Sequence, residues 1–379
     1  MWPSSWMNPE LAAFREQVRR FVATELTPHQ ERFAQQQHID REIWNRAGEL
    51  GILCADIPAE YGGSGGTFAH QTVVFEEQAY AGDTAMNISV HIILAHYILN
   101  QGTQAQKEKW LPKMATGELV GAIAMSEPGA GSDLANIRTT ARLEGDHYVL
   151  NGSKTFISNG FLADFMVVVA RTSDTPGAKG ISLLLVETKN APGFKVGKKL
   201  HKIGQKGNDT CELFFEDLKV PKENLLGDSE GRGFAQLMTE LPYERLIIAV
   251  YAVATIERAV KLTVEYTKER KAFGKALLEL QNTRFKLAEA KTNAVVARTF
   301  LDRCIEELIA GKLDTVTASM AKYWLSDLQC QVIDECLQLF GGYGYTLEYP
   351  IAQMFADARV QRIYGGANEI MKELIARSL

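Results

Sequence analysis

The sequence predicts an α+β protein of several domains. A helical N-terminal domain (residues 1–120) is followed by a middle β-barrel or sheet domain (121–232) and by a C-terminal helical domain similar to a four-helix bundle (233–379). Apolar residues recur at helical spacing in the first and last parts, whereas short β-branched or apolar runs bounded by turn residues fill the middle. With 379 residues, of which 46% are hydrophobic, the chain can bury sizeable cores.

The N-terminal domain begins with a clear helix signal. Asn8 followed by Pro9 is a cap and first-turn pair, and apolar residues then recur every three or four positions. Asp40 is expected to cap a second helix that stops at Gly51. A glycine-rich loop and two longer helical stretches are expected at 57–67, 71–99 and 104–114.

The middle domain is expected to start near residue 121, where the sequence pattern changes. Asn151-Gly152 suits the positive φ angles of a type I′ turn, so the segments on either side of it are expected to form a hairpin. Three further runs, which are bounded by turn residues, are expected to be strands: 165–170, 181–186 and 211–215. From about Gly233 helical spacing returns and continues to the C-terminus.

Composition excludes several classes of protein. The net charge of −5 gives no sign of a nucleic-acid binder, and no apolar run reaches the roughly 18 residues that an integral membrane protein needs. The five cysteines are scattered, which favours free thiols in a reduced compartment. The bacterial cytoplasm fits best, although a processed mitochondrial matrix protein would look the same.

Many common catalytic signatures are absent. There is no GxGxxG after a strand, no GxxxxGK[ST] and no GxSxG. The seven histidines form neither HxxxH nor HExxH, so no metal site is expected.

Three segments stand out, and each also has an ordinary structural explanation. GAIAMSEPGAGSD (121–133) offers glycines, hydroxyls and free amides to a ligand, or is a flexible loop between domains. ELPYER (240–245) contains a proline that is expected to bend its helix. QRIYGGANEIMKE (361–373) sets two glycines before a helix, or is a plain helix start.

Glu244 is the candidate general base in the second of these segments. It heads a helical stripe that contains Ile247, Ile248 and Tyr251. A carboxylate that faces an apolar stripe is expected to have a raised pKa, as a base for a weak carbon acid requires. The alternative is a glutamate paired with an arginine on a solvated face.

Together with further motifs, these segments closely resemble the acyl-CoA dehydrogenase family, and within it the long-chain members. The resemblance covers nearly the whole chain, in the family's order and spacing. It rests on AMSEPGAGSD (124–133), LNGSKTFISNG (150–160), ELPYERLIIA (240–249), RKAFGK (270–275), LQLFGGYGY (337–345) and RIYGGANEIMKELIAR (362–377).

The resemblance implies FAD as cofactor, an acyl-CoA as substrate, electron-transferring flavoprotein as acceptor and a homotetramer in which FAD is held across a subunit boundary. The residues that it assigns to FAD are Ile123, Ala124, Met125, Ser126, Gly131, Ser132, Phe156, Ile157, Ser158, Arg270, Phe273, Gln281, Gln338, Leu339, Phe340, Gly341, Gly342, Ala367, Asn368 and Glu369. Those that it assigns to the substrate are Ser132, Pro242, Tyr243, Arg245, Gly365 and Gly366.

The position of the base also follows from the resemblance. Many family members carry it as Tyr-Glu-Gly in the loop of the C-terminal motif, but this chain has Tyr364-Gly365-Gly366. The long-chain and isovaleryl members place the base on a helix, where this chain has Glu244. Glu244 would then take the α-proton of the thioester while the β-hydride passes to the flavin, and the Gly365 N–H would bind the thioester carbonyl.

Three questions stay open at this point. An acyl-CoA oxidase would share the site but pass electrons to oxygen, and a non-catalytic flavin-bound scaffold would keep the fold without turnover. The acyl chain is expected to be medium or long, or branched, because Gly365-Gly366 leaves room beside the reacting carbons. The tail pocket is expected to be floored by the helix that contains residues 84–94.

Overall fold

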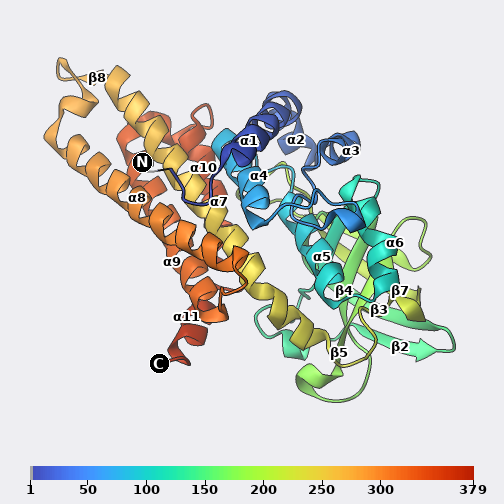
Figure 1. The fold of residues 1–379 in the computed structure, drawn as a ribbon. Helices are drawn as coiled ribbons and strands as arrows, with labels where there is room; N and C mark the ends of the chain where they lie inside the picture. The colour runs from blue at the N-terminus through green and yellow to red at the C-terminus, as the bar shows by residue number, and fades with distance from the viewer. Residues whose placement is uncertain (1–2) are drawn as a thin grey trace.

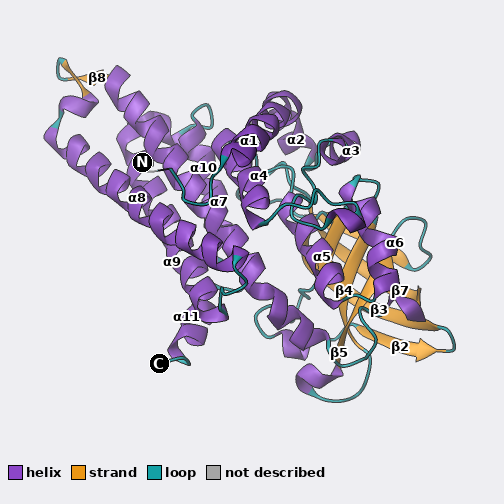
Figure 2. Ribbon diagram, viewed as in Figure 1, coloured by secondary structure: helices purple, strands orange, loops and turns teal. Residues whose placement is uncertain are grey.

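A computed structural model describes residues 3–379, and it shows three parts packed into one body (Figure 1). N-terminal helices lie above the centre, a β-sheet lies on one side, and long C-terminal helices extend to the other (Figure 2). The predicted α+β fold class is confirmed. The N-terminal helices are α1 (Pro9–Phe21), α2 (Gln30–Gln36), α3 (Arg41–Glu49), α4 (Phe68–Ala81), α5 (Ile88–Gln101) and α6 (Gln104–Ala115).

Two of the expected N-terminal helix features differ in outcome. The Asn8 side chain accepts a hydrogen bond from the Leu11 N–H at 2.8 Å, so the predicted cap of α1 is present. Asp40 precedes α3 but does not cap it, because its carboxylate is engaged by the Gln36 amide at 3.1 Å and by Arg32 at 2.7 Å. The expected cap at Asp40 was therefore wrong in its hydrogen bonding, although α3 does begin there.

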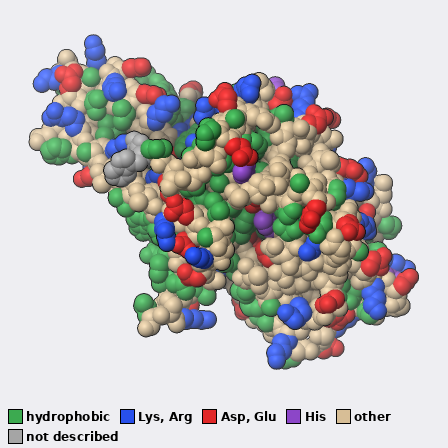
Figure 3. Space-filling model, in the orientation of Figure 1, with side chains coloured by type: hydrophobic (Ala, Val, Ile, Leu, Met, Phe, Trp, Pro, Cys, Tyr) green, Lys and Arg blue, Asp and Glu red, His purple; other side chains and the backbone are tan. Residues whose placement is uncertain are grey.

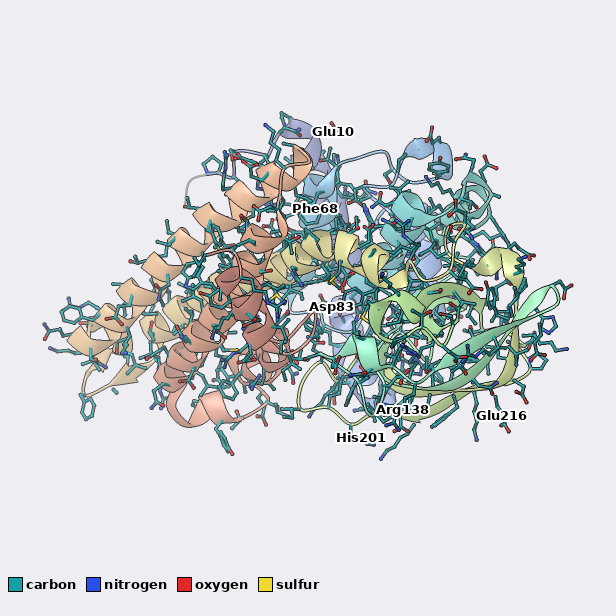
Figure 4. The ribbon with its side chains drawn as sticks, turned by 90° about the horizontal axis from the view of Figure 1, so that it is seen from below. Glu10, Phe68, Asp83, Arg138, His201 and Glu216 are labelled. Carbon is teal, nitrogen blue, oxygen red and sulfur yellow. The ribbon has the colours of Figure 1, made fainter. Side chains whose placement is uncertain are left out.

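The expected helical stretch 71–99 is divided into α4 and α5 by a short loop. Gly82 ends α4 in the left-handed conformation with φ +76°. Asp83 then accepts hydrogen bonds from the Ala85 N–H at 3.1 Å and the Gln78 amide at 3.0 Å, which fixes the turn into α5. Figure 4 shows Asp83 near the middle of the molecule, between the C-terminal helices and the sheet.

The middle part is a seven-stranded sheet with the path β1-β4-β2-β3-β7-β6, and β5 pairs with β4. Its apolar residues are divided between two cores: one face of β4 and β5, with Phe165, Val167 and Leu183, joins the large helical core, and the other face belongs to a core inside the sheet domain. The three runs expected as strands are confirmed as β4, β5 and β7. The strands are β1 (Gly121–Ala124), β2 (Thr140–Glu144), β3 (His147–Ser158), β4 (Phe165–Arg171), β5 (Ile181–Glu187), β6 (Phe194–Lys199) and β7 (Thr210–Pro221).

The hairpin turn expected at Asn151-Gly152 was wrong, because both residues lie inside β3. Gly152 has φ +147° and sits at a register shift between β3 and β7, where a Cβ would lie 2.5 Å from the Thr139 hydroxyl. The glycine therefore serves a bulge and a close approach. The actual turn between β2 and β3 contains Gly145, with φ +65°.

The C-terminal part is organised around one helix of 37 residues, α7, which packs against α4, α5, α8 and α9. Pro242 lies inside this helix, as expected, and the helix continues through it. At its far end a small hairpin leads into α8 (Figure 1). The elements are α7 (Gly233–Glu269), β8 (Lys271–Ala272), β9 (Lys275–Ala276), α8 (Gln281–Ile309), α9 (Thr315–Phe340), α10 (Pro350–Ala358) and α11 (Asn368–Ala376).

A buried charge network joins the N-terminal helices to the C-terminal ones. Arg298 of α8 pairs with Glu76 of α4, with Glu257 of α7 at 2.8 Å, and with Asp302 at 3.6 Å. Both Arg298 and Glu76 are buried. Because Arg15 of α1 also pairs with Glu76, the network ties α1, α4, α7 and α8 together.

Candidate membrane-spanning helices and metal-binding clusters were sought among the described residues. Within residues 3–379, no helix is long and apolar enough to cross a bilayer, and no cluster of three or more His, Cys, Asp or Glu side chains could hold a metal ion. All five cysteines are free thiols, in agreement with the sequence-based expectation.

Candidate active site

Glu244 lies in the buried part of α7 and is only 8% exposed. Its Oε1 accepts a hydrogen bond of 2.7 Å from the Tyr97 hydroxyl of α5. Burial raises the pKa of Glu244 to about 7; the nearby Glu240 also raises it, whereas the Tyr97 bond and Arg245 lower it. Glu244 therefore does not lie on a solvated face, and a carboxylate with this pKa is suited to general-base chemistry near neutral pH.

Glu240, one turn earlier on the same face of α7, is held quite differently. The Asn100 amide donates to its Oε2 at 2.9 Å, and the Gln101 amide donates to its Oε1 at 2.9 Å. Both oxygens of Glu240 are thus occupied by α5. Among residues 3–379, no residue donates a hydrogen bond to Oε2 of Glu244. Of these two glutamates, Glu244 is therefore the one that keeps a carboxylate oxygen free to accept a proton.

The Gly365-Gly366 loop lies against α7 one turn beyond Glu244. Both glycines have positive φ, +63° and +90°, which side chains rarely adopt. A Cβ on Gly365 would lie 2.3 Å from Cδ1 of Ile248, so this position has no room for a carboxylate side chain unless Ile248 moves. The loop therefore presents backbone beside the base.

A buried lysine of α9 holds the Gly365-Gly366 loop in place. Lys322 of α9 is fully buried, and its ammonium donates to the Gly366 carbonyl at 2.6 Å and to Oδ1 of Asn368 at 2.8 Å. Burial lowers the pKa of Lys322 to about 7. The Asn368 amide in turn donates to the Tyr323 carbonyl at 3.2 Å and to Asp327 at 2.9 Å. The Asn368 side chain is therefore fully engaged by other residues of the protein, and the expected contact of Asn368 with FAD stays a prediction.

The first predicted cofactor segments, 123–126 and 156–158, lie side by side. The Thr155 N–H donates to the Ser126 carbonyl at 2.9 Å, and the buried Lys154 ammonium donates to the Met125 carbonyl at 3.0 Å. The same ammonium pairs with Glu127 at 2.9 Å, whose carboxylate also accepts the Thr139 N–H. These bonds hold the start of the AMSEPGAGSD loop against β3.

Phe156 is strained and exposed at this junction. It has φ +60°, which is costly for a residue with a large side chain, and 69% of its surface is exposed. Gly129 and Gly131 are open, because a Cβ on either would meet nothing within 4 Å. A large exposed apolar side chain on a strained backbone is a candidate for an interaction surface.

A second group of predicted cofactor residues lies far from the first. Arg270 sits over the Tyr343 ring at 5.6 Å, which brings it next to the exposed Gly341 and Gly342. Phe273, between β8 and β9, has φ +52° and is 93% exposed. Figure 1 shows β8 at the opposite end of the molecule from the sheet. The remaining members of this group are Gln281, Gln338, Leu339 and Phe340, at the start of α8 and the end of α9.

The two groups therefore lie at opposite ends of the molecule (Figure 1). In Figure 3 hydrophobic side chains gather along the flank of the C-terminal helices, whereas the tip near β8 carries charged side chains among apolar ones. The expectation that FAD is held across a subunit boundary stays a prediction. Ala367 and Glu369 lie at the start of α11, near the Gly365-Gly366 loop rather than near Arg270.

The predicted substrate residues of α7 are the sequence neighbours of Glu244, and they are engaged to different degrees. Tyr243 donates to Asp56 at 2.9 Å, and its ring stacks on His96 at 4.0 Å. Arg245 is buried and donates to the Ser319 hydroxyl at 3.1 Å. Pro242 is half-buried and Ser132 is exposed.

A cavity of about 410 Å³ lies further along α7. It is lined by Tyr251 and Tyr364 and by the α4–α5 loop with the start of α5, including Thr84 and Ser89. These belong to the segment 84–94 that is expected to floor the tail pocket. Neither Glu244 nor Gly365 lines this cavity, so its link to the acyl chain stays a prediction.

Sequence reasoning missed the two side chains that hold the site in place, Tyr97 and Lys322. Lys322 follows the buried Ala318 and Ser319 at helical spacing, so its position on the inner face of α9 could have been found. Tyr97 gave no signal of its own, because its partner is 147 residues away.

This order of domains, with a buried carboxylate beside a glycine loop, defines a class of helical and β-sheet flavoprotein oxidoreductases. Three regions match family descriptions: acyl-CoA dehydrogenase N-terminal domain at 8–118, middle domain at 122–218 and C-terminal domain at 231–379. The chain belongs to the acyl-CoA dehydrogenase family, which acts on the CH–CH bond of acyl-CoA.

Individual relatives agree along nearly the whole chain. The mitochondrial long-chain specific acyl-CoA dehydrogenase of Mus musculus is 50% identical over 370 residues, covering 97% of this chain and 85% of that protein. An acyl-CoA dehydrogenase structure from Geobacillus kaustophilus has TM-score 0.96 at 47% identity and 99% coverage of both chains. A glutaryl-CoA dehydrogenase from Mycobacterium smegmatis in complex with FADH2 has TM-score 0.91 at 27% identity, covering 98% and 95% of the two chains.

Proposed function

We propose that this protein catalyses the FAD-dependent α,β-dehydrogenation of acyl-CoA thioesters to trans-2-enoyl-CoA, with Glu244 as the base that removes the α-proton. The observation that carries the proposal is the state of Glu244. It is a buried carboxylate with a pKa of about 7, one oxygen held and the other without a donor, one turn from a loop of bare backbone.

The residues around Glu244 suit the removal of a very weakly acidic proton. Burial keeps the carboxylate poorly solvated, which strengthens it as a base once the substrate displaces water. The Gly365 N–H is proposed to donate to the thioester oxygen as negative charge develops, and Lys322 holds the next carbonyl of that loop in position. FAD, when bound, accepts the β-hydride.

The residues present also fit FAD. Ile123, Ala124, Met125 and Ser126 with Phe156, Ile157 and Ser158 form one proposed surface for the flavin ring, extended by Gly131 and Ser132 and by Ala367 and Glu369. The other group of predicted cofactor residues lies at the end of the molecule opposite the sheet, and we propose that it holds the FAD of a second copy of the chain. This group consists of Arg270, Phe273, Gln281 and residues 338–342. Exposure of Phe156 and Phe273 supports both assignments.

The substrate is proposed to carry a medium or long acyl chain, or a branched one. The 50% identity to a long-chain specific relative supports length. Gly365-Gly366 gives no support for branching, because a Cβ there would lie 2.3 Å from Cδ1 of Ile248 or 2.6 Å from Cε of Met371. Turnover across straight and methyl-branched acyl-CoAs would test this, and equal rates on short and long chains would contradict it. Electron-transferring flavoprotein and a homotetramer are proposed from the family resemblance, and substantial peroxide release in air would instead favour an oxidase.

The test of the base is Glu244→Gln, compared with Glu240→Gln on the same helix face. Rapid mixing of each FAD-loaded variant with acyl-CoA under anaerobic conditions reports flavin bleaching directly. We expect Glu244→Gln to bind FAD but to lose at least about a hundred- to ten-thousandfold in the bleaching rate. Glu240→Gln should still be bleached. Fast bleaching in Glu244→Gln would refute the assignment.

A further inference from the structure

We propose that Tyr97 is the positioning residue of the base: its hydroxyl holds one carboxylate oxygen of Glu244 so that the other faces the substrate. The inference rests on the proposed function of Glu244. It concerns a different residue on a different helix, which takes no part in the family motifs that identified the site.

The geometry supports a fixed contact between two buried groups. Tyr97 is fully buried in α5, and its hydroxyl lies 2.7 Å from Oε1 of Glu244. The side chains at positions +3 and +4 from Tyr97, Asn100 and Gln101, both bond to Glu240. Because Glu240 and Glu244 are also one turn apart, α5 and α7 are joined at two successive turns, and Tyr97 has little freedom to move away.

The chemistry requires a donor that does not itself compete for the proton. Burial raises the pKa of Tyr97 well above its ordinary value, as does the negative charge of Glu244 beside it. Tyr97 therefore keeps its proton and only donates a hydrogen bond. Such a donor stabilises the charged carboxylate against its burial, and it leaves Oε2 as the acceptor of the α-proton.

Other charged and titratable groups surround the pair and must be kept constant in any test. On α7 these are Glu240, which raises the pKa of Glu244, and Arg245, which lowers it. His96 lies on α5 next to Tyr97, and it faces Asp56 at 3.1 Å rather than Glu244. Lys322 reaches the site from α9, next to Arg245.

The test is Tyr97→Phe, which removes only the hydroxyl. Anaerobic flavin bleaching by acyl-CoA would be followed from pH 5.5 to 9.5. We expect the midpoint of the rate profile, near pH 7 in the unmodified protein, to rise by about one pH unit, because a bond to a charged acceptor is lost. We also expect the plateau rate to fall by about tenfold, because Glu244 can then rotate.

The matched control is Tyr148→Phe in the sheet. Tyr148 is buried and donates to Glu230 at the same distance of 2.7 Å, but Glu230 lies outside the proposed site. This variant also loses a buried tyrosine hydroxyl bonded to a glutamate. Its pH profile should match that of the unmodified protein. A shift of equal size in both variants would overturn the proposal, because it would indicate a general effect of losing a buried hydroxyl.

A second readout does not depend on turnover. Infrared difference spectra between the unmodified protein and Glu244→Gln isolate the protonated carboxyl band of residue 244, which can be titrated in either tyrosine background. Tyr97→Phe should move that titration to higher pH, and an unchanged titration would refute the positioning role. Failure of the base itself would appear separately, as fast bleaching in Glu244→Gln.

Discussion

Substituting Gly365 with alanine tests whether Ile248 closes the space where other family members carry their base. The added Cβ meets two costs. The φ of +63° makes any L side chain unfavourable by about 1–2 kcal/mol. The Cβ would also lie 2.3 Å from Cδ1 of Ile248, and overpacking of this kind costs about 1–3 kcal/mol. We therefore expect Gly365→Ala to lower the free energy of unfolding by the sum of the two costs, about 2–5 kcal/mol.

Ile248→Val separates the two costs, because it removes the clashing Cδ1 while the next atom, Cγ1, stays at 3.8 Å. Alone it should cost about 0.5–1.5 kcal/mol. In the double variant the clash disappears, so the two changes should be less than additive by about 1–3 kcal/mol. The assay is denaturant unfolding at fixed protein and FAD concentration.

Gly145→Ala is the control, because Gly145 has φ +65° but a Cβ there would meet nothing within 4 Å. It should cost only the backbone part, and Ile248→Val should not change that cost. Additivity of Gly365→Ala and Ile248→Val within about 0.5 kcal/mol would refute the argument. The loop would then have to accommodate the Cβ by moving as a whole.

Two further predictions concern stability. The folded-state pKa of Glu244 is raised from its ordinary 4.5 to about 7, so between these pH values the folded protein binds more protons than the unfolded chain, and the contribution of Glu244 to stability falls as the pH rises. Glu244→Gln should therefore be more stable than the unmodified protein by up to about 3 kcal/mol at pH 8, and by little at pH 5. A gain in stability that does not depend on pH would contradict this. Arg298→Met should lower the free energy of unfolding by about 3–5 kcal/mol in denaturant unfolding, because it leaves the buried Glu76 partly unpaired. The control Arg303→Met breaks an exposed pair with Glu307 on the same helix and should cost less than about 0.5 kcal/mol. Equal losses in the two variants would show that the buried ion pairs contribute no more to stability than the exposed pair.

The sequence predicted the order of parts and many elements because local patterns determine them. Apolar spacing identified α7 from Gly233, and the Asn8 cap fixed the start of α1. Asn151-Gly152 misled because a turn dipeptide also suits a bulge, and only the approach of Thr139 distinguishes the two. Non-local partners decided that case.

The candidate site shows the same division. Glu244 could be placed on an apolar stripe from its own helix, and its burial agrees with that interpretation. Tyr97 could not be found, because nothing near it in sequence indicates a partner on α7. Asn368 was assigned to FAD from its motif alone, and its side-chain contacts to Lys322 and Asp327 could not be found from the sequence. Contacts between residues that are far apart in the sequence can be found only in the three-dimensional structure.

The length of α7 has a consequence for how variants combine. Position 244 and position 270 are 26 residues apart along this helix and its end, which at 1.5 Å per residue is about 39 Å. In the proposed assembly this one helix carries the base of one catalytic centre about a third of the way along its length, and a residue that binds the cofactor of the neighbouring centre at its C-terminal end. A substitution at position 244 would then inactivate the chain's own catalytic centre, and one at position 270 would impair the neighbouring centre. Mixed oligomers of the two inactive variants would therefore contain some centres in which both positions are intact, and these would be active.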